Sequence, residues 1–136
     1  MSRMHCRLVV AALVLSLVSA CKSEPPPPQL ESVTSALGAW QGRGSTTIGF
    51  VSDSGRFRIR WNAKNESPPR SGRLHLTVHS AVSGRPLQEV LDYRGEGSGS
   101  VDFSDDPRSY NLMVDSANVD WSIAVDGISG VYRGRP

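Results

Sequence analysis

The sequence predicts an all-β domain, an antiparallel β-sandwich or jelly-roll-like fold of about eight short strands. Three observations lead to this prediction. Apolar and polar residues alternate with a period of two in several segments, turn motifs separate these segments, and no long amphipathic helical pattern competes with them. Parallel strands would need crossover segments, usually helices, so antiparallel pairing is expected.

Four segments show the strand alternation most clearly. In each, apolar residues occupy every second position, which is typical of strands with one face in a core and one in water. These clear strands are predicted at 56–61, 74–79, 110–115 and 119–126, and further strands at 45–51, 87–93, 98–103 and 128–133. The side chains expected to anchor the core are Phe57, Ile59, Trp61, Leu112, Trp121 and Ile123.

Turn residues separate the predicted strands. Asp53-Ser54-Gly55 can close a hairpin, and Asp126-Gly127 fits the two-residue type I′ turn of another, because Asp-Gly tolerates the positive φ angles that this turn needs. Ahead of the first strand, the apolar residues of segment 30–37 have helical spacing. This spacing predicts a short helix or turn that ends at Gly38.

The first twenty residues have the layout of an export signal. Residues 1–7 carry Arg3 and Arg7 and no acid, residues 8–18 are apolar apart from Ser16, and small residues follow. A basic start, an apolar stretch of roughly 7–15 residues and a small-residue exit describe a secretory signal. The run is too short for a spanning helix, which needs about 20 residues. A buried core helix is the alternative, but the polar, proline-rich sequence that follows argues against it.

The exit of this segment is more specific than a general signal. Val18-Ser19-Ala20-Cys21 resembles the lipobox of bacterial lipoproteins, in which an aliphatic residue and two small residues precede a cysteine. The resemblance implies that Cys21 is the first mature residue and carries the membrane-anchoring lipid. It also implies a cell-envelope location, with Lys22 at the sorting position favouring the outer membrane because an aspartate there favours inner-membrane retention. An ordinary cleaved signal with a free cysteine remains the competing interpretation.

The sequence accordingly divides into three parts. Residues 1–20 are the predicted signal peptide, 21–32 the lipidated cysteine and a proline-rich tether, and 33–136 the β-sandwich domain. Four consecutive prolines, Pro25 to Pro28, favour the extended polyproline II conformation, which suits a semi-rigid spacer. A proline-rich ligand motif for a partner is the alternative. The domain loosely resembles small secreted bacterial β-sandwich modules, through Trp40 and the glycines of segment 95–99.

Composition and charge exclude several classes of protein. The chain has 136 residues, 38% hydrophobic, 21% charged and a formal charge of +2, which is ordinary for a globular protein and too weakly basic for a dedicated nucleic-acid binder. Loss of Arg3 and Arg7 with the signal leaves thirteen basic and thirteen acidic side chains. Residues 33–94 hold nine basic and four acidic side chains, whereas residues 95–136 hold three and seven. The domain has no cysteine, so packing must stabilise it.

The polar residues suggest two candidate sites. Arg56, Arg58 and Arg60 alternate along one strand, and as an exposed strip they would bind an anionic polysaccharide, a lipid phosphate or an acidic envelope protein. The alternative is that they pair with acids across the sheet. Asp102, Asp105 and Asp106 form a calcium-site candidate, although Ca²⁺ prefers six to eight oxygens, and a solvated turn is the alternative.

The sequence shows no pattern for catalysis. His75 and His79 have the spacing of a helical metal pair, but on a strand they lie about 13 Å apart, at roughly 3.3 Å per residue. Apart from the calcium-site candidate, no metal, cofactor or catalytic residue is predicted. We expect a non-enzymatic binding or accessory role in the envelope. The alternatives are an enzyme with an unidentified site and a carbohydrate-binding module that uses Trp40, Tyr93 or Tyr132.

Overall fold

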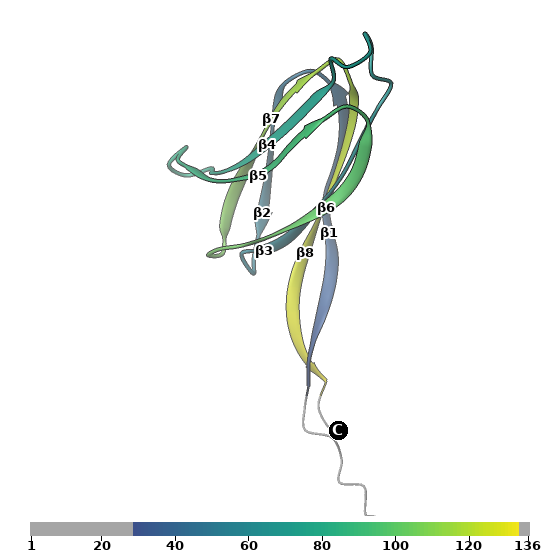
Figure 1. Ribbon diagram of the computed structural model, residues 1–136. Helices are drawn as coiled ribbons and strands as arrows, with labels where there is room; N and C mark the ends of the chain where they lie inside the picture. The colour runs from purple at the N-terminus through teal and green to yellow at the C-terminus, as the bar shows by residue number, and fades with distance from the viewer. Residues whose placement is uncertain (1–28, 134–136) are drawn as a thin grey trace, which may run out of the picture.

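The computed structural model describes residues 29–133, and this part of the chain consists of eight β-strands and no helix. The strands form two four-stranded antiparallel sheets, sheet A in the order β1-β8-β3-β6 and sheet B in the order β2-β7-β4-β5 (Figure 1). The strands are β1 (Gln29–Arg43), β2 (Thr46–Ser52), β3 (Arg56–Lys64), β4 (Arg73–Ser80), β5 (Pro86–Arg94), β6 (Gly97–Ser104), β7 (Arg108–Ala117) and β8 (Asp120–Arg133). The predicted all-β sandwich is confirmed, whereas the predicted signal and Cys21 lie outside the described residues.

The strand order is that of a jelly roll. The strands form four nested antiparallel pairs: β1 with β8, β2 with β7, β3 with β6 and β4 with β5. This arrangement is that of one long hairpin folded over itself. Every connection except that from β4 to β5 therefore crosses between the sheets. The prediction that Asp53-Ser54-Gly55 closes a hairpin was wrong, because this turn carries the chain from β2 in sheet B to β3 in sheet A.

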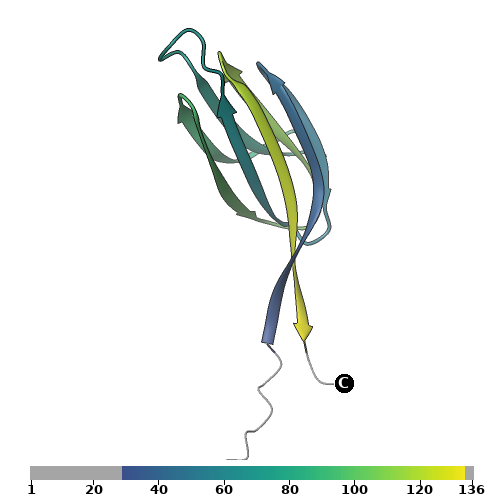
Figure 2. The same ribbon diagram turned by 90° about the vertical axis from the view of Figure 1, so that its right-hand side faces the viewer.

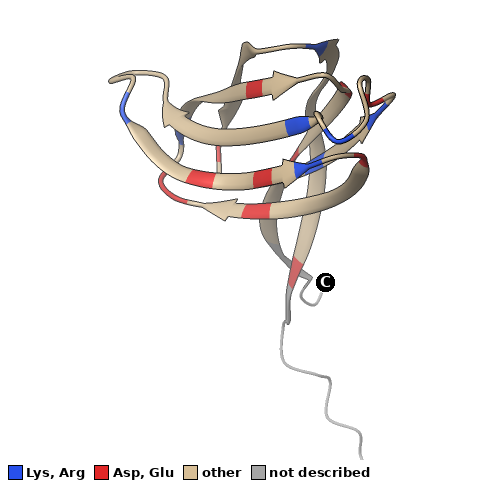
Figure 3. Ribbon diagram, turned by 45° about the horizontal axis from the view of Figure 1, so that its top comes forward, with Lys and Arg blue, Asp and Glu red and all other residues tan. Residues whose placement is uncertain are grey.

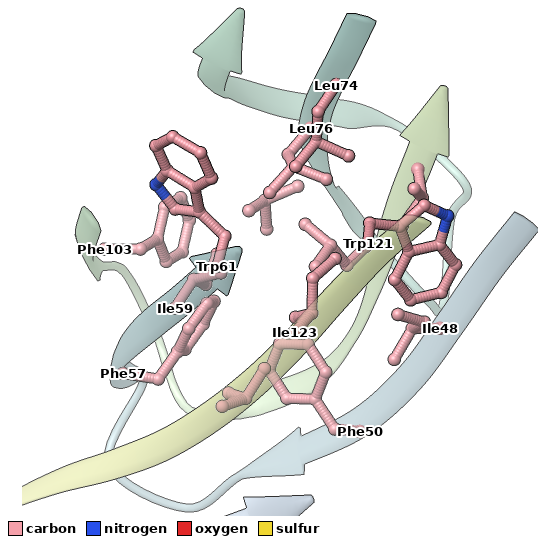
Figure 4. Packing of buried hydrophobic residues seen from close by; sticks show 14 of the residues in the cluster. Ile48, Phe50, Phe57, Ile59, Trp61, Leu74, Leu76, Phe103, Trp121 and Ile123 are labelled. Atoms are coloured by element: carbon pink, nitrogen blue, oxygen red, sulfur yellow. The ribbon is translucent and has the colours of Figure 1, made fainter. Parts of the chain in front are cut away.

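The inward faces of the two sheets meet in one apolar core (Figure 4). All six side chains predicted to anchor it are buried, and their strands alternate between buried and more exposed positions as predicted. Aromatic rings fill one part of this core. The ring of Phe57 lies 4.8 Å from that of Phe50 in an edge-to-face arrangement and stacks on Phe103 at 4.9 Å. Such pairs contribute to stability beyond the area that they bury.

The predicted helix or turn in segment 30–37 was wrong, because these residues belong to β1. Their backbone pairs with β8 along its whole length, and this long ladder outweighs a helical spacing that only a few apolar residues define. A bulge at Leu37 shifts the register between Ala36 and Gly38 and turns the Leu37 side chain toward the core. Gly38 does not end a helix. It lies under the ring of Trp40, where a β-carbon would come within 2.4 Å of a ring atom.

The predicted hairpin at Asp126-Gly127 was also wrong, because both residues lie inside β8. They pair with β1 on one side and with β3 on the other. Asp126 is held by Arg60, and the side chain of Leu37 packs against Gly127, so the contacts of two ladders override the local turn preference. The chain turns earlier, between β7 and β8, where Asn118 has a φ of 59°. Asparagine tolerates this left-handed conformation better than most residues.

Beyond the sandwich, β1 and β8 continue as a projecting two-stranded ribbon (Figures 1 and 2). This arm consists of residues 29–34 of β1 and 128–133 of β8, and β3 pairs with β8 only as far as Gly127. Because β1 begins at Gln29, the strand includes residues 29–32, which the sequence had suggested as tether. The start of β1 and the end of β8 lie together at the tip of the arm. Between residues 29 and 133, no helix has the length and hydropathy of a membrane span.

Candidate functional site

The centre of the outer face of sheet A is hollowed. Its outward side chains form two rows across three neighbouring strands, and several of them are short. They are Ala39 and Gln41 on β1, Ser122 and Ala124 on β8, and Arg60 and Asn62 on β3. Because alanine and serine occupy positions where longer side chains would cover the backbone, the surface has an open hollow of about 530 Å³. We call it the sheet A hollow.

One of the two rows in this hollow carries only uncharged hydrogen-bonding groups. Gln41 pairs in register with Ser122, and Ser122 with Asn62. The amide and hydroxyl groups of these side chains make no hydrogen bond to another residue of the described chain. The row continues beyond the hollow to Ser98 on β6. The hollow therefore presents a line of donors and acceptors that a ligand can use.

The other row contains Arg60, which belongs to a charged pair. Arg60 binds Asp126 through two hydrogen bonds, Nε to Oδ2 at 2.7 Å and Nη2 to Oδ1 at 3.3 Å. This pair fixes the direction of the guanidinium group, although more than half of the Arg60 side chain stays exposed. Arg60 thus stands at the border of the hollow with a free Nη1 group.

The arginine strip suggested by the sequence is largely paired with acids. Arg58 binds Asp102 through Nε to Oδ1 at 2.7 Å and Nη2 to Oδ2 at 3.0 Å, a two-point contact across neighbouring strands. Arg60 is engaged by Asp126 as described above. Arg56 is exposed, and within residues 29–133 its guanidinium group has no hydrogen bond or ion pair. The three guanidinium groups therefore do not act as one free cationic strip.

These contacts shift the ionisation of the acids involved. The hydrogen bond from Arg58 holds the pKa of Asp102 below its usual range. At the far end of the same sheet, hydrogen bonds from Asn65 and Arg43 lower the pKa of Asp120. Hydrogen bonding to a carboxylate favours its charged form, so both acids remain ionised well below neutral pH.

The jelly-roll topology explains why charges that are segregated in the sequence are paired in space. The basic residues dominate the first half of the domain and the acidic residues the second half. Nested pairing places early strands beside late ones, so Arg43 on β1 meets Asp120 on β8 and Arg58 on β3 meets Asp102 on β6. Figure 3 shows basic and acidic residues interspersed over the strands. The uneven charge of the sequence is therefore partly balanced by pairs across neighbouring strands.

The three aspartates of the calcium-site candidate have arginine partners in the structure. Asp102 binds Arg58, whereas Asp105 and Asp106 lie 3.6 and 3.2 Å from a guanidinium nitrogen of Arg108. In the described part of the chain, no three His, Cys, Asp or Glu side chains are grouped so that they could hold a metal ion.

The two histidines are on the outer face of sheet B and have separate partners. His75 Nε2 lies 3.4 Å from Glu89 Oε2, and His79 Nδ1 lies 3.2 Å from the carbonyl oxygen of Gly84. Both residues are half-buried and lie four residues apart on the same face of β4. The structure does not bring them together, as the strand spacing predicted.

The aromatic residues considered for sugar stacking pack against the core instead. Trp40 is half-buried with its ring 6.4 Å from that of Phe50, and Tyr93 packs on Trp61 at 4.7 Å. Among the residues whose burial the structure describes, no aromatic residue is fully exposed. Trp40 and Tyr93 are half-buried, and Trp40 also lines the sheet A hollow. The side chain of Tyr132 lies outside this set.

Apart from Arg60, the outward residues of the sheet A hollow were not predicted as a site. Gln41, Asn62 and Ser122 are ordinary outward residues in the sequence, and only the register of three strands distant in the chain places them in one row. The alternation of inward and outward side chains along each strand would alone have placed Asn62 and Ser122 on outer faces.

No protein-family model matches the chain, and a comparison with curated proteins finds no significant match.

Proposed function

We propose that the protein is a lipid-anchored component of the bacterial cell envelope with a non-enzymatic binding or accessory role. The observation that carries this proposal is the lipobox-like sequence Val18-Ser19-Ala20-Cys21, preceded by a basic start and an apolar run. Two or three acyl chains on Cys21 would hold the protein on the membrane far more firmly than the marginal binding of a single chain. The acceptor leaflet is expected to belong to the outer membrane, because Lys22 and not aspartate follows the cysteine.

The arm supports this arrangement. Seven residues separate Cys21 from the start of β1 at Gln29. In the polyproline II conformation that the sequence predicts, at about 3.1 Å per residue, they would span roughly 22 Å. Since β1 starts at the tip of the arm, the arm would point toward the bilayer and the sandwich would stand above it. The outer faces of both sheets would then remain accessible from the side.

The outer face of sheet A supports a binding role. The sheet A hollow offers amide and hydroxyl groups without internal partners, while the neighbouring Arg58 and Arg60 are already paired with acids. This arrangement suits recognition of a ligand by hydrogen bonds.

Metabolic labelling tests the anchor. Cells that express the wild type should incorporate radioactive palmitate into the protein, and Cys21→Ser should abolish the label because the acceptor thiol is lost. Cys6→Ser is the matched control, since Cys6 lies in the predicted signal and its loss should leave labelling unchanged. Equal labelling of wild type and Cys21→Ser would overturn the proposal. Separation of the two membranes on a density gradient checks the location, which co-migration with inner-membrane markers would contradict.

A further inference from the structure

We propose that the sheet A hollow binds a hydroxyl-rich glycan chain of the cell envelope, recognised by hydrogen bonds from Gln41, Ser122 and Asn62. This inference rests on the proposed binding role of the domain. It gives that role a site and a chemical class of ligand. The three side chains come from β1, β8 and β3 and lie in one row across the sheet.

The row is suited to an extended ligand that lies across the strands. Neighbouring strands are about 4.8 Å apart, so Gln41, Ser122 and Asn62 span roughly 10 Å, and Ser98 on β6 extends the row by one further strand. Primary amides and hydroxyls both donate and accept, which matches the hydroxyl groups of a sugar. The next row contains Ala39 and Ala124, whose short side chains leave room for the body of the chain.

The exposed apolar residues argue against a protein partner in this hollow. Protein interfaces have an apolar core enriched in aromatic residues and methionine. The exposed large apolar side chains of the described chain lie elsewhere, with Val33 on the arm, Val51 and Met113 on strands of sheet B, and Val82 in the β4–β5 loop. Alanine is the only apolar type among the outward side chains of the hollow. Trp40, Trp61 and Ile123 also line it, but they belong to the core or pack against it, so a protein would gain little from covering this hollow.

Charge argues against a polyanion such as a nucleic acid. The guanidinium groups in the rows next to this one, those of Arg60 and Arg43, are held by carboxylates at 2.7 and 3.0 Å, and the neighbouring Lys64 pairs in register with Asp120. A polyanion would have to displace these acids or accept their repulsion. A neutral or weakly acidic glycan meets no such barrier, and Nη1 of Arg60, which makes no hydrogen bond within residues 29–133, remains free to donate to it.

Binding to isolated glycans tests the site with the full-length lipidated protein, purified from membranes in detergent. Two probes separate the two envelope sources of such a ligand. Sedimentation with insoluble peptidoglycan sacculi measures binding to one, and calorimetry with delipidated lipopolysaccharide glycan measures binding to the other. Binding to either supports the proposal and identifies the source.

Substitutions test whether the glycan binds in the hollow. Each lost hydrogen bond is expected to weaken binding about 3- to 10-fold, so Gln41→Ala combined with Asn62→Ala should weaken it at least about 10-fold. Ala124→Phe should abolish binding by filling the hollow. The control is Asn111→Ala, since Asn111 is also half-buried but lies on β7 of sheet B, and it should bind like the wild type.

Three results would overturn the inference. Absence of wild-type binding to both glycans would overturn it, as would equal weakening by Asn111→Ala. Unchanged binding in the double variant, whose folding circular dichroism verifies, would also overturn it even if Ala124→Phe failed to fold. None of these results affects palmitate labelling at Cys21, so a failure of the site can be distinguished from a failure of the anchor.

Discussion

Trp121 connects the core of the sandwich to its β1 edge, so its truncation tests which faces of the sheets are inward. The side chain is 4% exposed, and its Nε1 donates a hydrogen bond to the carbonyl oxygen of Gly44 at 2.8 Å. Its ring also covers Gly42, where a β-carbon would lie 3.0 Å from a ring atom. Trp121→Ala removes all of these contacts and leaves a cavity between the sheets.

The expected loss is large for a domain of this size. Truncation of a buried Phe or Trp to Ala costs about 3–5 kcal/mol. The lost hydrogen bond adds little, because Gly44 is only half-buried and water can replace the donor. For a domain of about 100 residues, 1 kcal/mol lowers Tm by about 4 °C or more, so Tm should fall by at least about 12 °C. Trp121→Phe keeps most of the apolar contact and should cost about 1–2 kcal/mol.

Thermal and urea unfolding followed by circular dichroism measure this effect. The control is Val82→Ala, because Val82 is 86% exposed in the β4–β5 loop and its truncation should change stability by less than about 0.5 kcal/mol. If Trp121→Ala lowered Tm by no more than this control, the assignment of the inward face of β8 would be refuted.

Three further predictions concern the ionisable groups and one turn. Burial raises the pKa of Tyr110, so the stability that this group contributes is present below its ordinary pKa near 10 and is lost at higher pH. Urea titrations above pH 10 should therefore show a steeper loss of stability for wild type than for Tyr110→Phe, and parallel curves would refute this. Arg58 lowers the pKa of Asp102, so the stabilisation that this pair contributes is present above pH 4 and is lost as the pH falls further. Asp102→Asn should therefore flatten the acid side of the plot of Tm against pH, and an unchanged acid side would refute this prediction. Gly55→Ala should cost at least about 2 kcal/mol in urea unfolding, because φ is +73° and a β-carbon would lie 1.9 Å from a backbone oxygen. Gly84→Ala, where φ is +71° but the surrounding space is open, should cost less, and equal costs would contradict the proposed clash.

Strand periodicity was sufficient to predict the core but not the extent of every strand. The alternation around Phe57 and Trp121 correctly identified the inward faces, because burial on one face of a sheet produces that pattern directly. Segment 30–37 was misread because half of it forms an arm with little burial, where no alternation is required. Asp126-Gly127 was misread because a strong local turn signal lies within a strand that is paired on both sides.

The candidate site was less accessible to sequence reasoning than the fold. The pairing of Arg58 and Arg60 with acids was one of two interpretations, and only the strand order decides between them. The sheet A hollow depends on the register of β1, β8 and β3, which are far apart in the chain. Gln41, Ser122 and Asn62 carry no chemical signature individually, so their meaning as a row required the structure.

The intact mass of the protein extracted from cell membranes tests the central claim most directly. If Cys21 anchors the jelly-roll domain, the mass must correspond to a chain that begins at Cys21 and carries a diacylglycerol, usually with a further acyl chain on its amino group. Tandem fragmentation should place the added mass on that first residue. A chain that begins at another residue, or one that begins at Cys21 without lipid, would contradict the account.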